Sequence, residues 1–345
     1  MERYYHALIA EIGLFADKNK GCSLSTLYIG GGTPSTWPDN LLLDTSGKII
    51  SVFCTERLQE VTIEVNPGTV RREQLVLWRR CGINRLSIGV QYADPEVLAL
   101  LNRFQSPQEV QELLFSASAE FDNISVDLML GLPGVTDVCW KRFINEVVTW
   151  PITHISLYCL MVHEHTPFFY KVERGEISLP DEELVADLYC WSIEFLAMHG
   201  FMQYEVSNFA RQGYESQHNT VYWDRKPYKG FGLGACSFDG DRRFMNEQNL
   251  LQYIQMLEQG KNPTMFFEQL SKDDVRLEKI MLGLRRSVGI RYELVTEGLS
   301  SDKRSEIESK VQQLCASGLL QILDGVVKLT HAGFVVEQEL IAELA

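Results

Sequence analysis

Short apolar runs rich in β-branched residues alternate along the chain with longer stretches of helical periodicity. A run of four to eight apolar residues is typical of a strand, and spacing of three to four between apolar positions is typical of a helix. The strand-like runs are 25–30, 61–65, 85–90, 123–130 and 154–160. The helical patterns lie near 3–19, 51–59, 71–81, 94–118 and 137–148. This succession predicts an α/β fold of parallel βαβ units with right-handed crossovers.

Beyond about residue 203 the pattern changes. The segment to about 260 is rich in glycine, aromatic and turn residues, which predicts a return to the sheet edge and a cover over a domain of residues 1–264. Helical patterns near 272–286 and 301–317, a β-like run at 319–330 with Asp-Gly at its turn, and a last helix from 331 follow. They predict a small winged-helix-like α+β domain over 265–345, for which covering the first domain is a better account than binding DNA.

Polar and glycine residues follow the predicted strands. Because the carboxyl ends of parallel strands meet at one edge, we expect these residues to form a ligand site there. Three successive glycines before Pro34 predict a ligand close to the backbone. For the two carboxylates a structural ion pair is the alternative, and the glutamine and arginine alone read as surface or capping residues. The candidates are Gly31, Gly32, Thr33, Glu64, Gln91, Arg103 and Asp127.

The stretch QHNTVYW (217–223) gathers a histidine, an asparagine and two aromatic residues: His218, Asn219, Tyr222 and Trp223. An imidazole can ligate a metal or haem iron, and the aromatic rings offer flat apolar surface with polar groups at the rim. A buried aromatic cluster around a hydrogen-bonded histidine is the alternative. His163 and His165 have the spacing of metal ligands on a strand, but no third ligand accompanies them.

Composition narrows the functional classes. The formal net charge of −14 argues against a nucleic-acid or anionic-membrane surface, because both need a basic face. Apolar runs are strand-sized and the first residues lack a signal-peptide core, so we expect a cytoplasmic protein without a transmembrane segment. The eight cysteines are dispersed, the nearest two being Cys139 and Cys159, which predicts reduced thiols and no local zinc or iron–sulfur motif.

Six ordered motifs over about residues 1–260 resemble the radical S-adenosylmethionine (SAM) superfamily, in its branch of oxygen-independent coproporphyrinogen III oxidases. They are YIGGGTPS, EVNPG, GINRLSIGVQ, DLMLGLPG, ISLYCL and YEVSNFA. The tail resembles the carboxyl-terminal domain of that family. The stretch HNTVYW is similar to a motif that is linked to haem binding in the HemW group of haem chaperones and that separates this group from the oxidases.

The resemblance implies an open, partial TIM-type barrel and gives the candidate residues roles. Gly31, Gly32 and Thr33 would hold the methionyl end of SAM, and Leu160 would line its adenine. Glu64, Gln91, Arg103 and Asp127 would supply further polar contacts to SAM, or to the second SAM molecule found in the oxidase branch. His218 would ligate haem iron, with Asn219, Tyr222 and Trp223 around the haem.

The resemblance also implies a Cys-x3-Cys-x2-Cys loop that ligates a 4Fe–4S cluster, and an additional first strand. Both are expected just before Met1, and no such cysteine triplet occurs in the chain. A start site assigned too far downstream, a natural truncation and a fragment all remain open. We expect the chain as given to hold no cluster and no catalytic residue, and not to cleave SAM reductively.

Three functions are compatible with these patterns. The first is a HemW-type chaperone that binds haem and passes it to apoproteins, which the HNTVYW stretch favours. The second is a radical SAM enzyme of porphyrin biosynthesis that acts as a coproporphyrinogen III oxidase. The third is a degenerate protein that binds SAM or a tetrapyrrole without chemistry. The expected partners are haem or another tetrapyrrole and haem-accepting apoproteins, not nucleic acid; the oligomeric state stays open.

Overall fold

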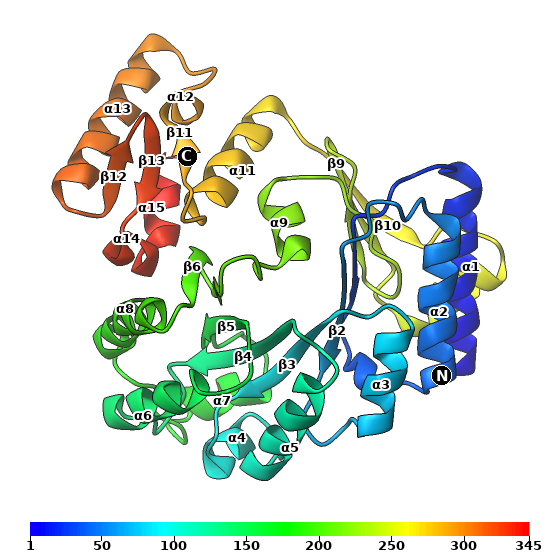
Figure 1. Cartoon of the computed structure of the whole chain (residues 1–345). Helices are drawn as coiled ribbons and strands as arrows, with labels where there is room; N and C mark the ends of the chain where they lie inside the picture. The colour runs from blue at the N-terminus through cyan, green and yellow to red at the C-terminus, as the bar shows by residue number, and fades with distance from the viewer. Residues whose placement is uncertain (345) are drawn as a thin grey trace.

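The computed structural model describes residues 1–344, which form a mixed α/β fold around one curled sheet (Figure 1). The sheet has seven strands in the order β1-β2-β3-β4-β5-β7-β6. The first five are parallel to their neighbours, and the last two are antiparallel. Their bounds are β1 (Thr26–Ile29), β2 (Glu60–Val65), β3 (Arg85–Gln91), β4 (Ile124–Leu130), β5 (His154–Cys159), β6 (Met202–Glu205) and β7 (Asn208–Ala210).

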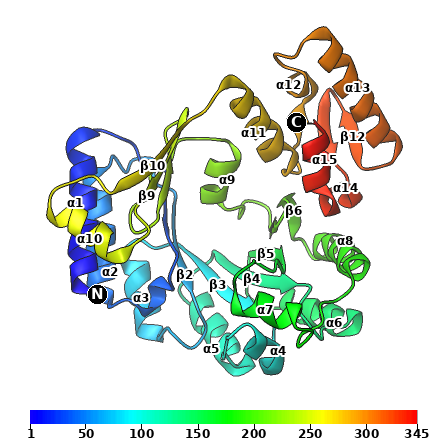
Figure 2. The ribbon, with the colours of Figure 1, turned by 180° about the vertical axis from the view of Figure 1, so that it is seen from behind.

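Helices cover the convex side of this half-barrel, and one short helix, α9 (Gln217–Trp223), lies on the concave side in both views (Figures 1 and 2). Between the parallel strands run α2 (Asp39–Val52), α3 (Arg72–Arg80), α4 (Pro95–Leu100), α5 (Pro107–Ser118) and α6 (Asp137–Val147). The remaining elements of this part are α1 (Glu2–Lys18), the 3-10 turn η1 (Pro34–Thr36), α7 (Pro167–Glu173) and α8 (Glu182–Met198).

The two faces of the sheet differ in polarity because side chains alternate along each strand. In β2, Val61, Ile63 and Val65 are buried against the helices, whereas Glu60, Thr62 and Glu64 occupy the alternate positions. In β3 the apolar positions are Leu86, Ile88 and Val90, and the alternate positions are Arg85, Ser87, Gly89 and Gln91. The apolar face anchors the helices, and the concave face is left polar.

A second sheet of three antiparallel strands, in the order β10-β9-β8, packs with α10 (Leu250–Glu258) beside α1. Its strands are β8 (Cys236–Phe238), β9 (Arg242–Asn246) and β10 (Thr264–Gln269). Glu11 of α1 is 3 % exposed and fastens this layer, because it accepts hydrogen bonds from Lys229, Asn246 and Tyr253.

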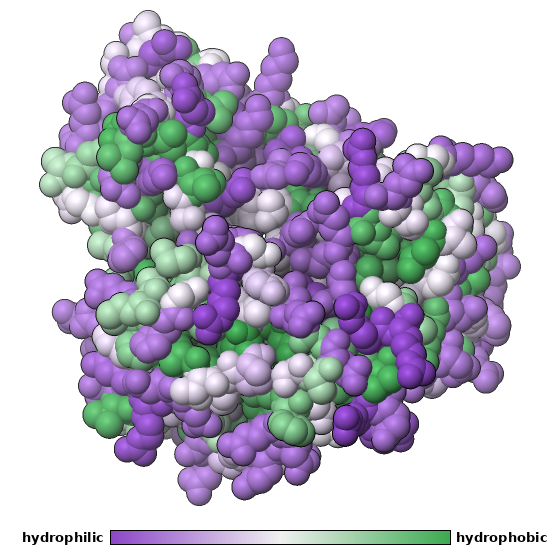
Figure 3. Space-filling view, in the orientation of Figure 1, coloured by the Kyte–Doolittle hydropathy of each residue, from purple (hydrophilic) through white to green (hydrophobic). Residues whose placement is uncertain are grey.

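The carboxyl-terminal part combines helices with a third small sheet in the order β11-β13-β12. Asp324 and Gly325 form the hairpin turn with φ of 51° and 74°, as their Asp-Gly sequence predicts. Hydrophobic side chains gather on this part of the surface in Figure 3. Among the apolar residues of this part, Ile322 and Leu323 are exposed. The elements are α11 (Lys272–Leu284), β11 (Ile290–Arg291), α12 (Tyr292–Val295), α13 (Ser301–Ala316), β12 (Leu320–Leu323), β13 (Val326–Leu329), α14 (His331–Val335) and α15 (Glu337–Leu344).

All five predicted parallel strands are present, and two helix predictions are wrong. Residues 51–59 do not form the helix between β1 and β2, because α2 begins earlier, at Asp39 after Pro38. The predicted helix 94–118 is two helices, since Asn102 has a φ of 56° and Pro107 begins α5 behind an N-cap at Ser106. Helices α7 and α8 were not predicted. Among residues 1–344, the helices are too short or too polar to span a bilayer.

Candidate functional site

The glycine-rich loop after β1 is bound to the end of β2 through one carboxylate. Glu64 accepts the Gly31 N–H on Oε2 at 3.0 Å and the Tyr28 hydroxyl on Oε1 at 2.9 Å. A Cβ at Gly30 would lie 2.5 Å from Tyr28 Cε1, so this position has no room for a side chain. Beside Gly31 and Gly32, by contrast, no atom lies within 4 Å of such a Cβ. The space beside both glycines is therefore open to a ligand, although the N–H and carbonyl of Gly31 are already bonded to Glu64 and to the Thr33 N–H.

A second group of polar side chains converges over Gly89 at the end of β3. Arg103 donates to the Gly89 carbonyl at 3.3 Å and to Asn66 Oδ1 at 3.5 Å. Asn66 in turn donates to Thr33 Oγ1 at 3.2 Å, which links this group to the glycine loop. Gln91 has a φ of 65° at an irregularity in the β3–β4 pairing. Strained backbone of this kind is concentrated at ligand sites.

Asp127 on β4 completes this edge, since it is the register partner of Gly89. Ser87 donates to its carboxylate at 3.2 Å. Loss of hydration raises the pKa of Asp127 to about 6, although hydrogen bonds from Ser156 and Ser87 and the charge of Arg85 oppose this shift. A carboxylate at this position is therefore costly without a ligand that donates to it.

The structure brings together six of the eight predicted SAM residues. Gly31 and Glu64 are hydrogen-bonded to each other, and Thr33 and Arg103 are both hydrogen-bonded to Asn66. Gln91 and Asp127 both lie beside Gly89. Gly32 lies in the same loop. Leu160 is farther along the edge, where its N–H donates to Leu130 and its Cβ would lie 3.9 Å from one at Gly131.

Sequence reasoning missed the polar residues deeper on the concave face. Arg85 is 2 % exposed, and its buried side-chain Nε has no hydrogen-bond partner among residues 1–344. His154 is bonded to Ser125 and Tyr204, and burial lowers its pKa. Glu60 is 3 % exposed. The alternation of polar and apolar residues in EVTIEV, RLSIGVQ and HISLYC is the signal that identifies them.

The predicted haem stretch forms α9, whose first turn is fixed to β2. The Glu60 carboxylate accepts the backbone N–H groups of Gln217 at 2.9 Å and of His218 at 3.0 Å. Ser216 is the N-cap and accepts the Asn219 N–H. A carboxylate at this end of a helix offsets its unsatisfied N–H groups and its dipole. Glu60 therefore sets the position of His218 against the sheet.

Both nitrogens of the His218 ring have partners. Nδ1 lies 2.8 Å from Thr26 Oγ1, and Nε2 lies 2.9 Å from the hydroxyl of Tyr222, which is 39 % exposed. The ring also stacks on Tyr28, with centroids 5.0 Å apart. Burial is the main cause that lowers the pKa of His218 to about 4, so the imidazole is neutral at physiological pH. The Tyr222 hydroxyl therefore occupies the Nε2 side of the imidazole.

Two lysines lie near α9, and two further histidines lie beyond β5. Lys226 pairs with Asp224 at 2.7 Å, and Lys229 pairs with Glu11 at 3.1 Å, so neither lysine is without a partner. His163 and His165 lie in the loop before α7. Within residues 1–344, His, Cys, Asp and Glu side chains nowhere gather in threes as metal ligands do.

The sequence matches two protein-family models, the Radical SAM superfamily at residues 2–147 and the HemN C-terminal domain at residues 270–336. Heme chaperone HemW of Bacillus subtilis (strain 168) is 31% identical over 338 residues, which cover 96% of this chain and 88% of that protein. HemW of Lactococcus lactis (strain IL1403) is 33% identical over 294 residues, covering 85% and 76%. The chain belongs to the HemW family of the radical SAM superfamily.

The fold agrees with this membership. The structure of coproporphyrinogen III oxidase (HemN) from Escherichia coli matches with a TM-score of 0.83 at 24% identity, covering 99% of this chain and 82% of that one. At this identity the likeness shows the fold, which is the half-barrel expected for a HemW protein.

Membership of the radical SAM superfamily implies SAM and a 4Fe–4S cluster, and the described residues fit the first of these. The open space beside Gly31 and Gly32 and the poorly hydrated carboxylate of Asp127 suit a ligand with ammonium and hydroxyl donors, and Arg103 suits its carboxylate. The cysteines do not fit the second: all eight are free thiols dispersed over the fold.

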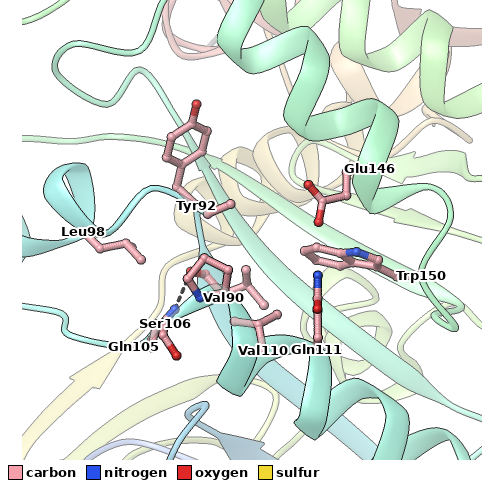
Figure 4. Close-up of a pocket in the computed structure, with 11 residues that line it drawn as sticks. Val90, Tyr92, Leu98, Gln105, Ser106, Val110, Gln111, Glu146 and Trp150 are labelled. Atoms are coloured by element: carbon pink, nitrogen blue, oxygen red, sulfur yellow. Dashed lines mark hydrogen bonds between the residues drawn. The ribbon is translucent and has the colours of Figure 1, made fainter.

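Two hollows lie away from this edge. One, of about 210 Å³, is lined by polar residues that precede β2, β3 and β4, including Gln59, Asn84 and Asn123. The other is shown in Figure 4, between the end of β3 and helices α5 and α6, where Val90, Val110 and Trp150 surround about 10 Å³. The second has room for about one water molecule, so it is a packing void of this HemW protein.

Proposed function

We propose that this protein is a haem chaperone of the HemW type, which binds haem as cargo and transfers it to apoproteins. The observation that carries the proposal is the environment of His218 on α9, in a chain that belongs to a family whose curated members are named heme chaperones. Haem is held at His218, with Tyr222 and Trp223 of the same helix beside it.

The hydrogen bonds of His218 support a role as an iron ligand. When Nδ1–H donates to Thr26 Oγ1, the Nε2 lone pair points to the Tyr222 hydroxyl. A metal-binding histidine commonly has its second nitrogen fixed in this way by a hydrogen bond. The low pKa of His218, caused by burial, keeps that lone pair unprotonated. Haem binding at Nε2 therefore requires that the Tyr222 hydroxyl give way.

SAM is proposed to bind at the carboxyl edge of the sheet. Gly31, Gly32 and Thr33 hold its methionyl end through backbone groups, and Glu64, Gln91, Arg103 and Asp127 supply the polar contacts. In this superfamily SAM supplies a reactive sulfonium. The residues of this chain bind and orient the molecule, and Leu160 lines its adenine.

The test is a haem titration of His218→Ala followed by absorbance. We expect a shifted Soret band and a weaker affinity by at least tenfold, because the axial imidazole is lost. His199→Ala is the matched control, since His199 ends α8 with its ring bonded to the Phe195 carbonyl and should leave the titration unchanged. An unchanged spectrum and affinity in His218→Ala would place the ligand elsewhere and leave α9 as a packing element.

The alternative of coproporphyrinogen III oxidation has the shared fold in its support, whereas the chaperone has relatives above 30% identity over most of the chain. A cytoplasmic location belongs to the proposal and is supported by eight free thiols. The proposal also includes two domains, a barrel with its cover at 1–264 and an accessory domain at 265–345. The second family model, at 270–336, supports the accessory domain.

A further inference from the structure

Tyr28 lies between the two proposed binding sites and contacts both. Its ring stacks on the His218 ring at 5.0 Å with an interplanar angle of 21°. Its hydroxyl donates to Glu64 Oε1 at 2.9 Å. It is a half-buried residue in the middle of the short strand β1, so backbone pairing to β2 fixes its position. One side chain thus joins the haem motif to the carboxylate behind the glycine loop.

The contacts among Tyr28, Glu64 and the glycine loop leave little room for movement. Glu64 uses its second oxygen, Oε2, to accept the Gly31 N–H at 3.0 Å. The space at Gly30 is filled by the Tyr28 ring and by Glu64, whose Oε1 would lie 2.7 Å from a Cβ there. A displacement of Glu64 must therefore move either the tyrosine ring or the loop, because close-packed groups transmit displacement instead of absorbing it.

We propose that Tyr28 couples the two sites, so that SAM at the glycine loop strengthens haem binding at His218, and haem strengthens SAM binding equally. This inference rests on the proposed function. An ammonium or hydroxyl donor at the loop competes with the Tyr28 hydroxyl for Glu64 Oε1. Once released from Glu64, the Tyr28 ring can tilt away from His218, which frees the imidazole to turn toward iron. The reciprocity follows from thermodynamic linkage.

The test measures haem affinity with and without saturating SAM, and SAM affinity with and without haem, by absorbance and calorimetry. We expect each ligand to tighten the other about fivefold. Tyr28→Phe keeps the ring and loses the hydroxyl, so its ring is already released from Glu64. We therefore expect each ligand alone to bind this variant about as tightly as it binds the parent in the presence of the other ligand, and no coupling. Tyr5→Phe is the matched control, because Tyr5 also donates to a carboxylate, Asp44, but on α1 and α2; its coupling should equal that of the parent.

A second readout needs no haem. Addition of SAM should shift the NMR resonances of the His218 imidazole in the parent and in Tyr5→Phe, but not in Tyr28→Phe. Equal coupling in Tyr28→Phe and the parent, or independent binding of both ligands in the parent, would overturn the inference while the proposed function stands. Absence of SAM binding would overturn it as well. Haem affinity that is unchanged in His218→Ala is a different outcome, because it contradicts the proposed function itself.

Discussion

The carboxyl edge of the sheet and the helix α9 carry similar polar groups, but they differ in how well these groups are satisfied. At α9, both ring nitrogens of His218 and the first N–H groups of the helix have partners. At the edge, the space beside Gly31 and Gly32 is open, Gln91 has a φ of 65° and the pKa of Asp127 is raised by loss of hydration.

The difference indicates two ways of building a site. The edge keeps strained and poorly hydrated groups in place, several of which a ligand can contact directly; such sites lower stability in return for binding. The α9 site is closed by its own hydrogen bonds, and a ligand must displace one of them. Changes at the edge should therefore separate stability from binding, and changes at α9 should alter both together.

The largest effect is expected for Glu60→Ala, which removes the carboxylate that holds the first turn of α9. Two backbone N–H groups and the Ser216 hydroxyl lose an acceptor in a buried setting. We expect the free energy of unfolding to fall by about 3 kcal/mol, measured by urea denaturation, and haem binding to weaken with it. Loss of haem affinity at unchanged stability would contradict the closed-site account.

Two variants sharpen this result. Glu60→Gln keeps an acceptor oxygen but removes the charge, so its effect should be intermediate. Glu109→Ala is the matched control, since Glu109 also accepts hydrogen bonds at a helix start, but in a half-buried capping box of α5. We expect it to cost about 1 kcal/mol and to leave haem binding unchanged.

The parallel strands and the polar residues at their carboxyl ends could be predicted from the sequence, whereas the polar residues of the concave face could not. Apolar runs identified β1 to β5 because their outward residues are buried against helices. The inward residues Glu60, Arg85 and His154 alternate with them, but which face of a strand is covered depends on the closure of the sheet. The same limit holds for His218: its motif was visible, whereas its partners Thr26 and Tyr28 lie about 190 residues away in sequence.

The helix errors have local causes. The run 94–118 has a continuous helical period, and only the turn at Asn102 and the capping box of Ser106 and Glu109 divide it into α4 and α5. These are signals of backbone geometry that apolar periodicity does not carry.

A smaller effect, of opposite sign, is expected for Asp127→Asn. The folded pKa of Asp127 is about 6, above the usual value of about 3.9 in an unfolded chain. Between about pH 3.9 and pH 6 the carboxyl group of the folded protein keeps a proton that the unfolded chain has lost. The stability that Asp127 contributes is therefore lost as the pH rises from about 4 to about 6. The variant should therefore be more stable than the parent at pH 7, by about 2 kcal/mol.

The measurement is urea denaturation of both proteins from pH 4 to pH 8. The difference in free energy of unfolding between the two proteins should vanish near pH 4. Glu205, whose pKa is raised to about 7, titrates in both proteins and should not affect this difference. SAM binding should weaken in the same variant. Asp137→Asn, in the exposed first turn of α6, is the control and should give a difference below about 0.5 kcal/mol throughout. A variant less stable than the parent at pH 7 would mean that Asp127 is a structural residue.

The smallest change in stability, with a clear change in binding, is expected for Gly32→Ala. No atom lies within 4 Å of the added methyl group, and the backbone at Gly32 is outside the left-handed region. The free energy of unfolding should stay within about 0.5 kcal/mol of the parent, whereas Gly30→Ala, which collides with Tyr28 and Glu64, should lose about 1–3 kcal/mol.

SAM affinity, measured by calorimetry, separates this loop from an ordinary turn. If the ligand touches the backbone at Gly32, the methyl group occupies its place and the affinity falls although the protein is as stable as before. Gly47→Ala controls for glycine removal itself, since Gly47 lies inside α2 with no atom within 4 Å of its added Cβ. That variant should gain about 0.5–1 kcal/mol and bind SAM like the parent. Unchanged SAM affinity in Gly32→Ala would show that the glycines serve the turn alone, and the proposed site would then move toward Arg103 and Asp127.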